Sequence, residues 1–136
     1  IETAIVDALA AVEQAARAVR ERLAPTRLFD EAAPTFAMVS PLADGADQFA
    51  ARAALDRGWR LQAVLPFERA VYQQDFVGED PIETFEDLLN KASGVLELPG
   101  ERVREAESYL LAGRATVAHS DVIIAVWDGA PPRGRG

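Results

Sequence analysis

Near the end of the chain stands Ser120-Asp-Val-Ile-Ile-Ala-Val-Trp-Asp-Gly129, in which Val122 to Trp127 form a run of six apolar residues. A run of this length and composition is typical of a strand buried on both faces, as in a parallel sheet. A loop rich in glycine and arginine follows directly, at residues 130–136. Open α/β sheets bind ligands beyond the carboxyl ends of their strands, and glycine lets backbone approach a phosphate. We therefore expect a binding site at this end of the chain.

Upstream of this run, strand and helix patterns alternate along the chain. Short apolar runs predict strands at 36–39, 61–65 and 95–98. Helical periodicity predicts a first helix over about 2–24 and a second from the loop at 40–47 to about residue 57. It predicts further helices around 68–76, beginning at residue 80, and between Gly100 and the final strand. Strands that alternate with helices predict an α/β fold, a three-layer Rossmann-like sandwich with a mostly parallel sheet.

The first predicted helix carries an apolar stripe with spacings of three and four residues: Ile5, Leu9, Val12, Ala16, Val19 and Leu23. This stripe fits a helix lying on a sheet better than a coiled coil, because it covers few heptads. A doubly wound sheet usually begins with a strand, yet here a helix comes first. Either the sheet is unusual, or residues 1–136 are a single nucleotide-binding domain whose first strand and C-terminal elements lie outside this sequence.

The composition limits the classes of function. The 136 residues suffice for one domain, with 49% apolar residues, 26% charged residues and a net charge of −8. This negative charge argues against general binding to nucleic acid or to an anionic membrane. No apolar run is long enough to cross a membrane, and the chain has no cysteine for disulfides or a metal site. We expect a cytoplasmic protein with no metal and no cofactor.

Arginine dominates the basic residues, because Lys91 is the only lysine among the 14. A guanidinium group suits planar recognition of phosphate or carboxylate. The same bias also follows from a GC-rich genome, so it does not by itself indicate a ligand.

The loop Ser40-Pro-Leu-Ala-Asp-Gly-Ala-Asp47 is the first candidate site, since it joins a predicted strand to the start of a helix. Free amides and the helix dipole there would attract an anion near Ser40, Ala46 and Asp47, and Gly45 would allow close approach. The alternative is that Asp44 caps the helix and Gly45 eases the turn. The two carboxylates would repel a phosphate unless they face a ribose or water.

The segment after the last predicted strand is the second candidate site. Its residues suited to a ligand are Asp128, Gly129, Arg133, Gly134 and Gly136. The arginines could clamp phosphate oxygens and the aspartate could hold a sugar hydroxyl. A flexible tail is the alternative interpretation.

Arg114 is the third candidate, on the helix that leads into the final run. A cation near the end of a helix can also simply offset the helix dipole. The only histidine, His119, lies at a helix end without a second histidine or a cysteine to share a metal, and no serine with a defined base is evident. The sequence therefore identifies no catalytic residue, leaves open whether the chain is an enzyme, and predicts no metal ligand.

Several segments in this order resemble the SLOG superfamily of bacterial domains. They are residues 40–47, Val64-Leu-Pro-Phe67, Tyr72, Asp75-Phe76, Ala112-Gly-Arg114 and Ser120 to Gly129. The superfamily includes the DNA-processing protein DprA, the "lonely guy" phosphoribohydrolases that are also called lysine-decarboxylase-like proteins, and nucleotide-sensing modules.

The resemblance implies a Rossmann-like fold that binds a nucleotide or a nucleotide-derived metabolite. By position, Gly45 and Asp47 would border the ligand, Arg114 would match the arginine of the hydrolases, and Gly134 and Gly136 would approach phosphate. The hydrolases carry a P-G-G-x-G-T-x-x-E motif with a catalytic glutamate, whereas this chain has Trp127-Asp-Gly129 where the motif begins.

Our leading hypothesis is a module that binds or senses a nucleotide-like small molecule. The alternative is a phosphoribohydrolase that cleaves the N-glycosidic bond of a nucleoside monophosphate, with Arg114 and an acid beyond residue 136 acting on the leaving base. A third hypothesis, DprA-like binding of single-stranded DNA, conflicts with the charge of −8 and the lack of a basic groove with stacking aromatics. The resemblance also makes a homo-oligomer possible.

Overall fold

A computed structural model describes residues 1–127 and 129 of the chain. Three strands, β1 (Ala37–Ser40), β2 (Arg60–Leu65) and β3 (Gly94–Glu97), form one sheet in the order β1-β2-β3. Both strand pairs are parallel, with Met38 opposite Leu61 and Val64 opposite Leu96. The three strands predicted upstream of residue 120 are therefore confirmed.

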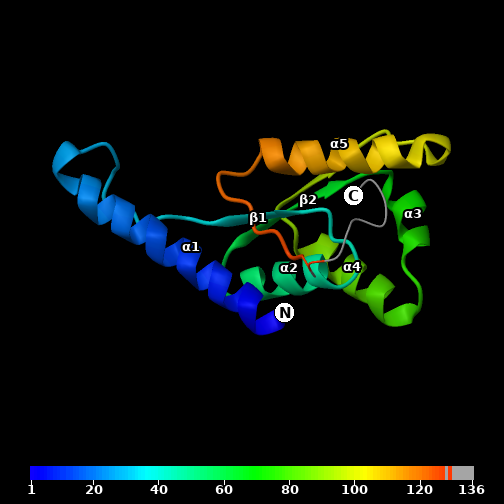
Figure 1. Cartoon of the computed structure of the whole chain (residues 1–136), viewed down its shortest axis with the longest axis horizontal. Helices are drawn as coiled ribbons and strands as arrows, with labels where there is room; N and C mark the ends of the chain where they lie inside the picture. Colours follow the sequence, from blue (N-terminus) through cyan, green and yellow to red (C-terminus); the bar gives the residue numbers. More distant parts are fainter. Residues whose placement is uncertain (128, 130–136) are drawn as a thin grey trace.

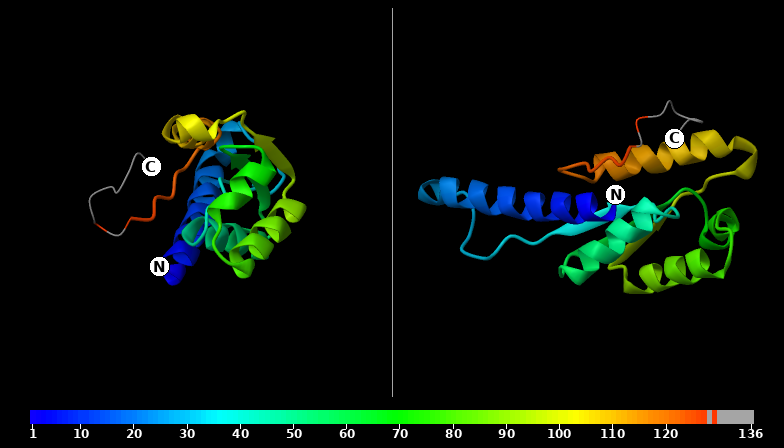
Figure 2. Two further views of the ribbon diagram at one scale, coloured as in Figure 1. Left: turned by 90° about the vertical axis from the view of Figure 1, so that its right-hand side faces the viewer. Right: turned by 60° about the horizontal axis from the view of Figure 1, so that its bottom comes forward.

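The sheet lies between two helical layers (Figures 1 and 2). The helices of the described residues are α1 (Glu2–Leu23), α2 (Ala46–Asp56), α3 (Arg69–Tyr72), α4 (Glu79–Lys91) and α5 (Glu105–Ala118). Three single 3₁₀ turns join them: η1 (Ala24–Thr26), η2 (Gln73–Asp75) and η3 (Arg102–Arg104). Helices α1, α2 and α4 cover one face of the sheet and α5 covers the other, so the chain has the expected α/β, three-layer Rossmann-like architecture.

The main core lies between the sheet and its helices. Leu61 and Leu65 of β2 point away from solvent and pack with Phe67, Phe85 and Leu88, all fully buried. This cluster explains the spacing of apolar residues in α4, since a helix on a sheet buries one stripe.

A second core cluster holds α1 against α2. Ile5 and Leu9 are buried beside Ala54 and Trp59, and the Trp59 ring stacks on Phe36 with centroids 5.0 Å apart. The prediction that α1 lies on the sheet is confirmed for its first half. The prediction that the stripe stays buried along the second half of α1, including Val19, is wrong, because this half extends past the end of the sheet into solvent.

The predicted strand Val122–Trp127 is wrong. This segment has irregular backbone and makes no ladder with the sheet. Its apolar side chains are exposed, with Ile123 60% and Trp127 76% accessible. A strand needs a neighbouring strand that forms hydrogen bonds with its backbone amides and carbonyls. Here a groove lies between this segment and β1, so no such hydrogen bonds form between them.

No helix in the described part of the chain combines the length and the apolar character needed to span a lipid bilayer.

Candidate functional site

A groove of about 560 Å³ runs along the edge of β1 that faces away from β2. Residues 37–40 of β1 form one wall, and residues 120–124 with Val126 form the opposite wall. At the carboxyl end of β1 the groove reaches Pro41, Ala46 and Asp47. The loop at 40–47, which is the first candidate site, and the beginning of the segment that follows α5 therefore border the same groove.

The loop after β1 is held by buried hydrogen bonds. The buried Ser40 hydroxyl accepts a bond from the Leu42 amide at 3.0 Å, and the side-chain amide of Gln48 donates to the carbonyls of Leu42 (3.4 Å) and Pro81 (3.2 Å). Leu42 is fully buried at a φ of 59°, a left-handed conformation that leucine rarely adopts. Such a residue costs about 1–3 kcal/mol in backbone strain. Burial of its side chain in the main core offsets that cost, so the loop has one defined shape.

Nothing in the sequence indicated the conformation of Leu42. Gln48 did leave a signal, because it is a polar residue on the side of α2 that faces the core. A buried amide at such a position needs partners, and the two carbonyls supply them.

Gly45 directly precedes α2, and the chain has a φ of 87° there. A side chain would have room there, so the requirement for glycine comes from the backbone angle alone. The Gln48 and Phe49 amides donate to the carbonyls of Ala43 and Gly45, and no side chain caps the helix. The alternative in which Asp44 is the cap is therefore wrong.

Two amides at the start of α2 remain available for a ligand. Within residues 1–127, no acceptor takes a hydrogen bond from the amides of Ala46 or Asp47. Uncapped amides and the positive end of the helix dipole together favour an anion. Both residues also line the groove.

Asp47 is half-buried beside these amides. Burial raises the pKa of its carboxyl, against a backbone hydrogen bond from Ala43 that acts in the opposite direction. A carboxyl with a raised pKa loses its charge sooner as the pH falls. Repulsion of a bound anion by Asp47 should therefore weaken as the pH falls through this raised pKa.

The other predicted residues are not gathered at this site. Arg114 is exposed on α5 and is not among the residues that line the groove. Gly129 has a φ of 81°. The remaining four, Asp128, Arg133, Gly134 and Gly136, lie outside the described residues. His119 ends α5 and lines the groove, with its Nδ1 2.7 Å from the carbonyl oxygen of Ala115.

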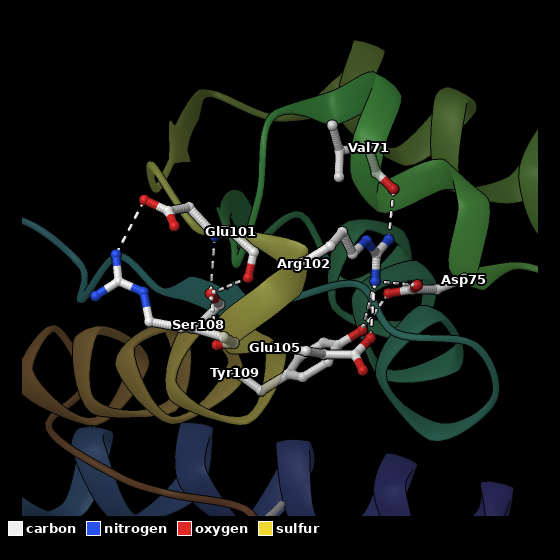
Figure 3. A network of polar contacts seen from close by, with 8 residues as sticks. Val71, Asp75, Glu101, Arg102, Glu105, Ser108 and Tyr109 are labelled. Carbon is white, nitrogen blue, oxygen red and sulfur yellow. Dashed lines mark hydrogen bonds and ion pairs between the residues drawn. The ribbon is translucent and has the colours of Figure 1, made fainter.

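A polar network that the sequence did not reveal covers the carboxyl end of β2 (Figure 3). The Arg102 guanidinium lies over the Phe67 ring, 4.2 Å from its centroid, and pairs with Asp75 at 2.7 Å. It also donates to the Val71 carbonyl at 2.5 Å, while the Tyr109 hydroxyl donates to Asp75.

Proton affinities reflect this network. Burial, followed by the bond to Asp75, raises the pKa of Tyr109 to about 12. Burial would lower the pKa of Arg102, but its bonds to Asp75 and Tyr109 raise it above the ordinary value. The network joins α3, η2, η3 and α5, and the pairing of its charged and hydroxyl groups with one another fits a structural role. Arg102 could have been suspected only from its place just after the turn at Gly100.

No group of three or more histidine, cysteine or acidic side chains in the described ranges is arranged to hold a metal ion. Comparison of the chain with protein-family models, with curated proteins and with solved structures gave no match.

Proposed function

We propose that this chain is a binding module for a nucleotide or nucleotide-derived small molecule, whose phosphate lies at the start of α2. The observation that carries the proposal is that the amides of Ala46 and Asp47, at the end of the groove, donate to no acceptor among the described residues. This end of the groove is the carboxyl end of a parallel strand, where open α/β sheets bind ligands.

The shape of the loop supports a preformed site. The bond from the Leu42 amide to Ser40 and the bond from Gln48 to the Leu42 carbonyl tie residues 40–42 to α2 without a ligand. A ligand therefore meets amides that are already oriented, and little ordering entropy opposes binding. The protein's net charge of −8 gives an overall field that repels anions, and recognition by local backbone amides fits that constraint.

A nucleotide panel tests the proposal. AMP, ADP, GMP and NAD are added to the chain, with adenosine as the control that lacks phosphate, and the melting temperature and heats of binding are measured. A bound nucleotide at 100 times its Kd should stabilise the fold by about 2.7 kcal/mol. Adenosine should bind much more weakly, because it has no anion for the α2 amides.

Two matched variants locate the site. Ala46→Asp places a carboxylate at the first position of α2, where the dipole favours it for folding but where it repels a phosphate. Ala46→Asn has the same size without the charge. The aspartate variant should bind nucleotides about tenfold or more weakly than the asparagine variant, since charges about 5 Å apart near a surface interact by a few kcal/mol. Equal affinities, or no stabilisation by any nucleotide, would refute the proposal.

The same panel separates binding from hydrolysis. Chromatography of each incubated mixture shows whether AMP or GMP releases its free base. Base release that is lost in Arg114→Ala would favour the phosphoribohydrolase alternative, whereas binding with intact nucleotide favours a sensing module.

A further inference from the structure

The side chain of Tyr72 has a hydroxyl group without a hydrogen-bond partner. Only 3% of this residue is exposed, and its ring packs edge-on against Phe76 and Phe85, with centroids 5.3 and 5.6 Å apart. Within residues 1–127, no group forms a hydrogen bond with the Tyr72 hydroxyl. A buried tyrosine hydroxyl usually has such a partner, so this group is suited to bind a ligand.

The Tyr72 hydroxyl is not sealed inside the core. Among the described residues, the side-chain oxygen that is fully enclosed without a partner is Thr116 Oγ1, and the Tyr72 oxygen does not share that condition. The aromatic neighbours therefore hold the ring in the core, while the oxygen stays in contact with solvent. A side chain held in this way loses little conformational entropy when a ligand binds.

The charges that act on Tyr72 indicate its place in the fold. Burial raises the pKa of its hydroxyl, and the nearby groups of Tyr109, Asp47 and Asp75 raise this pKa further. The charge of Arg102 acts in the opposite direction. Asp47 belongs to the first turn of α2, whereas the other three groups form the network at the end of β2. The Tyr72 hydroxyl is therefore near both the candidate anion site and this network.

The other tyrosine of the chain, Tyr109, already has a partner. Its hydroxyl donates to Asp75, which also pairs with Arg102 (Figure 3). The chain thus holds two tyrosines at the same end of the sheet, one with a bonded hydroxyl and one without.

The surroundings of Tyr72 favour a neutral polar ligand group over an anion. Asp47 and Asp75 bring two negative charges and Arg102 brings one positive charge. A phosphate beside the Tyr72 hydroxyl would be repelled, because no free amides offset this charge there. A sugar hydroxyl fits better, since it can accept a hydrogen bond from the tyrosine and donate one to a carboxylate.

We infer that Tyr72 is a sugar-binding residue, whose hydroxyl donates a hydrogen bond to a ribose hydroxyl of a nucleotide and gives the chain a preference for ribonucleotides over deoxyribonucleotides. This inference rests on the proposed function, because the phosphate at the start of α2 brings the sugar close to Asp47. In a nucleotide the ribose is bonded directly to the phosphate, which matches an anion site with a hydroxyl-binding group nearby. The amides of Ala46 and Asp47 then bind the phosphate, and Tyr72 binds the sugar.

Three nucleotides that differ only in their sugar test the inference. AMP, 2′-deoxy-AMP and 3′-deoxy-AMP carry the same phosphate and base, so a difference in affinity comes from a ribose hydroxyl. The Kd of each for the chain is measured by calorimetry. The net contribution of one neutral hydrogen bond corresponds to about a three- to tenfold change in affinity. At least one of the two deoxynucleotides should therefore bind more weakly than AMP by about this factor.

Two matched tyrosine variants assign the contact. Tyr72→Phe removes the hydroxyl and keeps the ring in the core, so it should bind AMP and both deoxynucleotides equally. Tyr109→Phe makes the same change where the hydroxyl already has a partner, so it should retain the preference for AMP. Without nucleotide, Tyr72→Phe should not lower the melting temperature, whereas Tyr109→Phe should lower it, because Asp75 loses a donor.

Three results would overturn the inference. Equal binding of AMP and both deoxynucleotides to the unchanged protein would exclude recognition of the sugar and leave the proposed function standing. A preference for AMP that persists in Tyr72→Phe, or that is lost equally in both variants, would show that it does not come from the Tyr72 hydroxyl. Absence of binding by all three nucleotides would refute the proposed function together with the inference.

Discussion

The turn at Gly100 makes the sharpest test of the packing around the carboxyl end of β2. A Cβ added to Gly100 would lie 2.0 Å from the Pro66 carbonyl oxygen and 2.8 Å from both Phe67 Cδ1 and Ser108 Cβ. Phe67 and Pro66 are fully buried, and the closest atom belongs to the backbone. The new methyl group therefore cannot be accommodated by rotating a flexible side chain.

Gly100→Ala should consequently force the end of β2 and the start of η3 apart. Overpacking of a filled core costs about 1–3 kcal/mol, and a clash with backbone belongs at the upper end, at about 3 kcal/mol. Domains of this kind have about 5–15 kcal/mol of stability in total, so the variant should fold but weakly. At about 3–5 °C per kcal/mol for a chain of this size, the melting temperature should fall by roughly 10 °C.

Gly113→Ala is the matched control, since it makes the same chemical change in the middle of α5. A Cβ at Gly113 meets nothing within 4 Å, and alanine is favoured over glycine in a helix by about 1 kcal/mol. This variant should melt a few degrees higher than the unchanged protein. Thermal and urea unfolding of both variants provide the comparison. A Gly100→Ala protein within about 1 kcal/mol of the unchanged protein would refute the packing described around Phe67.

Three further predictions concern the candidate site and α1. Burial raises the pKa of the Asp47 carboxyl. The protonated form therefore stabilises the fold fully below the ordinary pKa of 3.8, and this stabilisation is lost as the pH rises through the raised pKa. Asp47→Asn should be more stable than the unchanged protein in urea at pH 7, and equal stabilities would contradict this. The hydrogen bond from the Trp59 indole, followed by the charge and hydrogen bond of Arg57, lowers the pKa of Glu13, although burial acts in the opposite direction. Glu13→Gln should therefore lower the urea midpoint at pH 7. The difference in midpoint between the variant and the unchanged protein should shrink as the pH falls below the ordinary pKa of 4.5. Ser40→Ala leaves the buried Leu42 amide without its acceptor and should cost about 1–3 kcal/mol in thermal unfolding; an unchanged melting temperature would show that the loop does not depend on this bond.

Local pattern was sufficient to predict the regular elements of this fold. Short apolar runs located β1, β2 and β3, and the stripe beginning at Ile5 located α1. These predictions succeed because each element buries a side that its own periodicity defines. The extent of the buried stripe of α1 was not predictable, since it depends on where the sheet ends in space.

The candidate site was predicted in part. The loop between β1 and α2 could be found from its place between a strand and a helix, and the free amides of Ala46 and Asp47 agree with that position. The left-handed Leu42 and its link to Gln48 could not be found, because both depend on contacts between residues far apart in the fold. The same holds for Arg102, whose ring contact and ion pair come from three separate elements.

The sequence by itself determined the class of the fold and the order of its layers, because alternating periodicities of two kinds leave few arrangements that bury every apolar face. It also marked Val122 to Trp127 as a segment suited to a strand. Only the tertiary structure decided that this segment stands apart from β1 across a groove. The physical reason is that a helix satisfies its own backbone hydrogen bonds, whereas a strand exists only where a neighbour supplies them, and no local pattern says which neighbour is present.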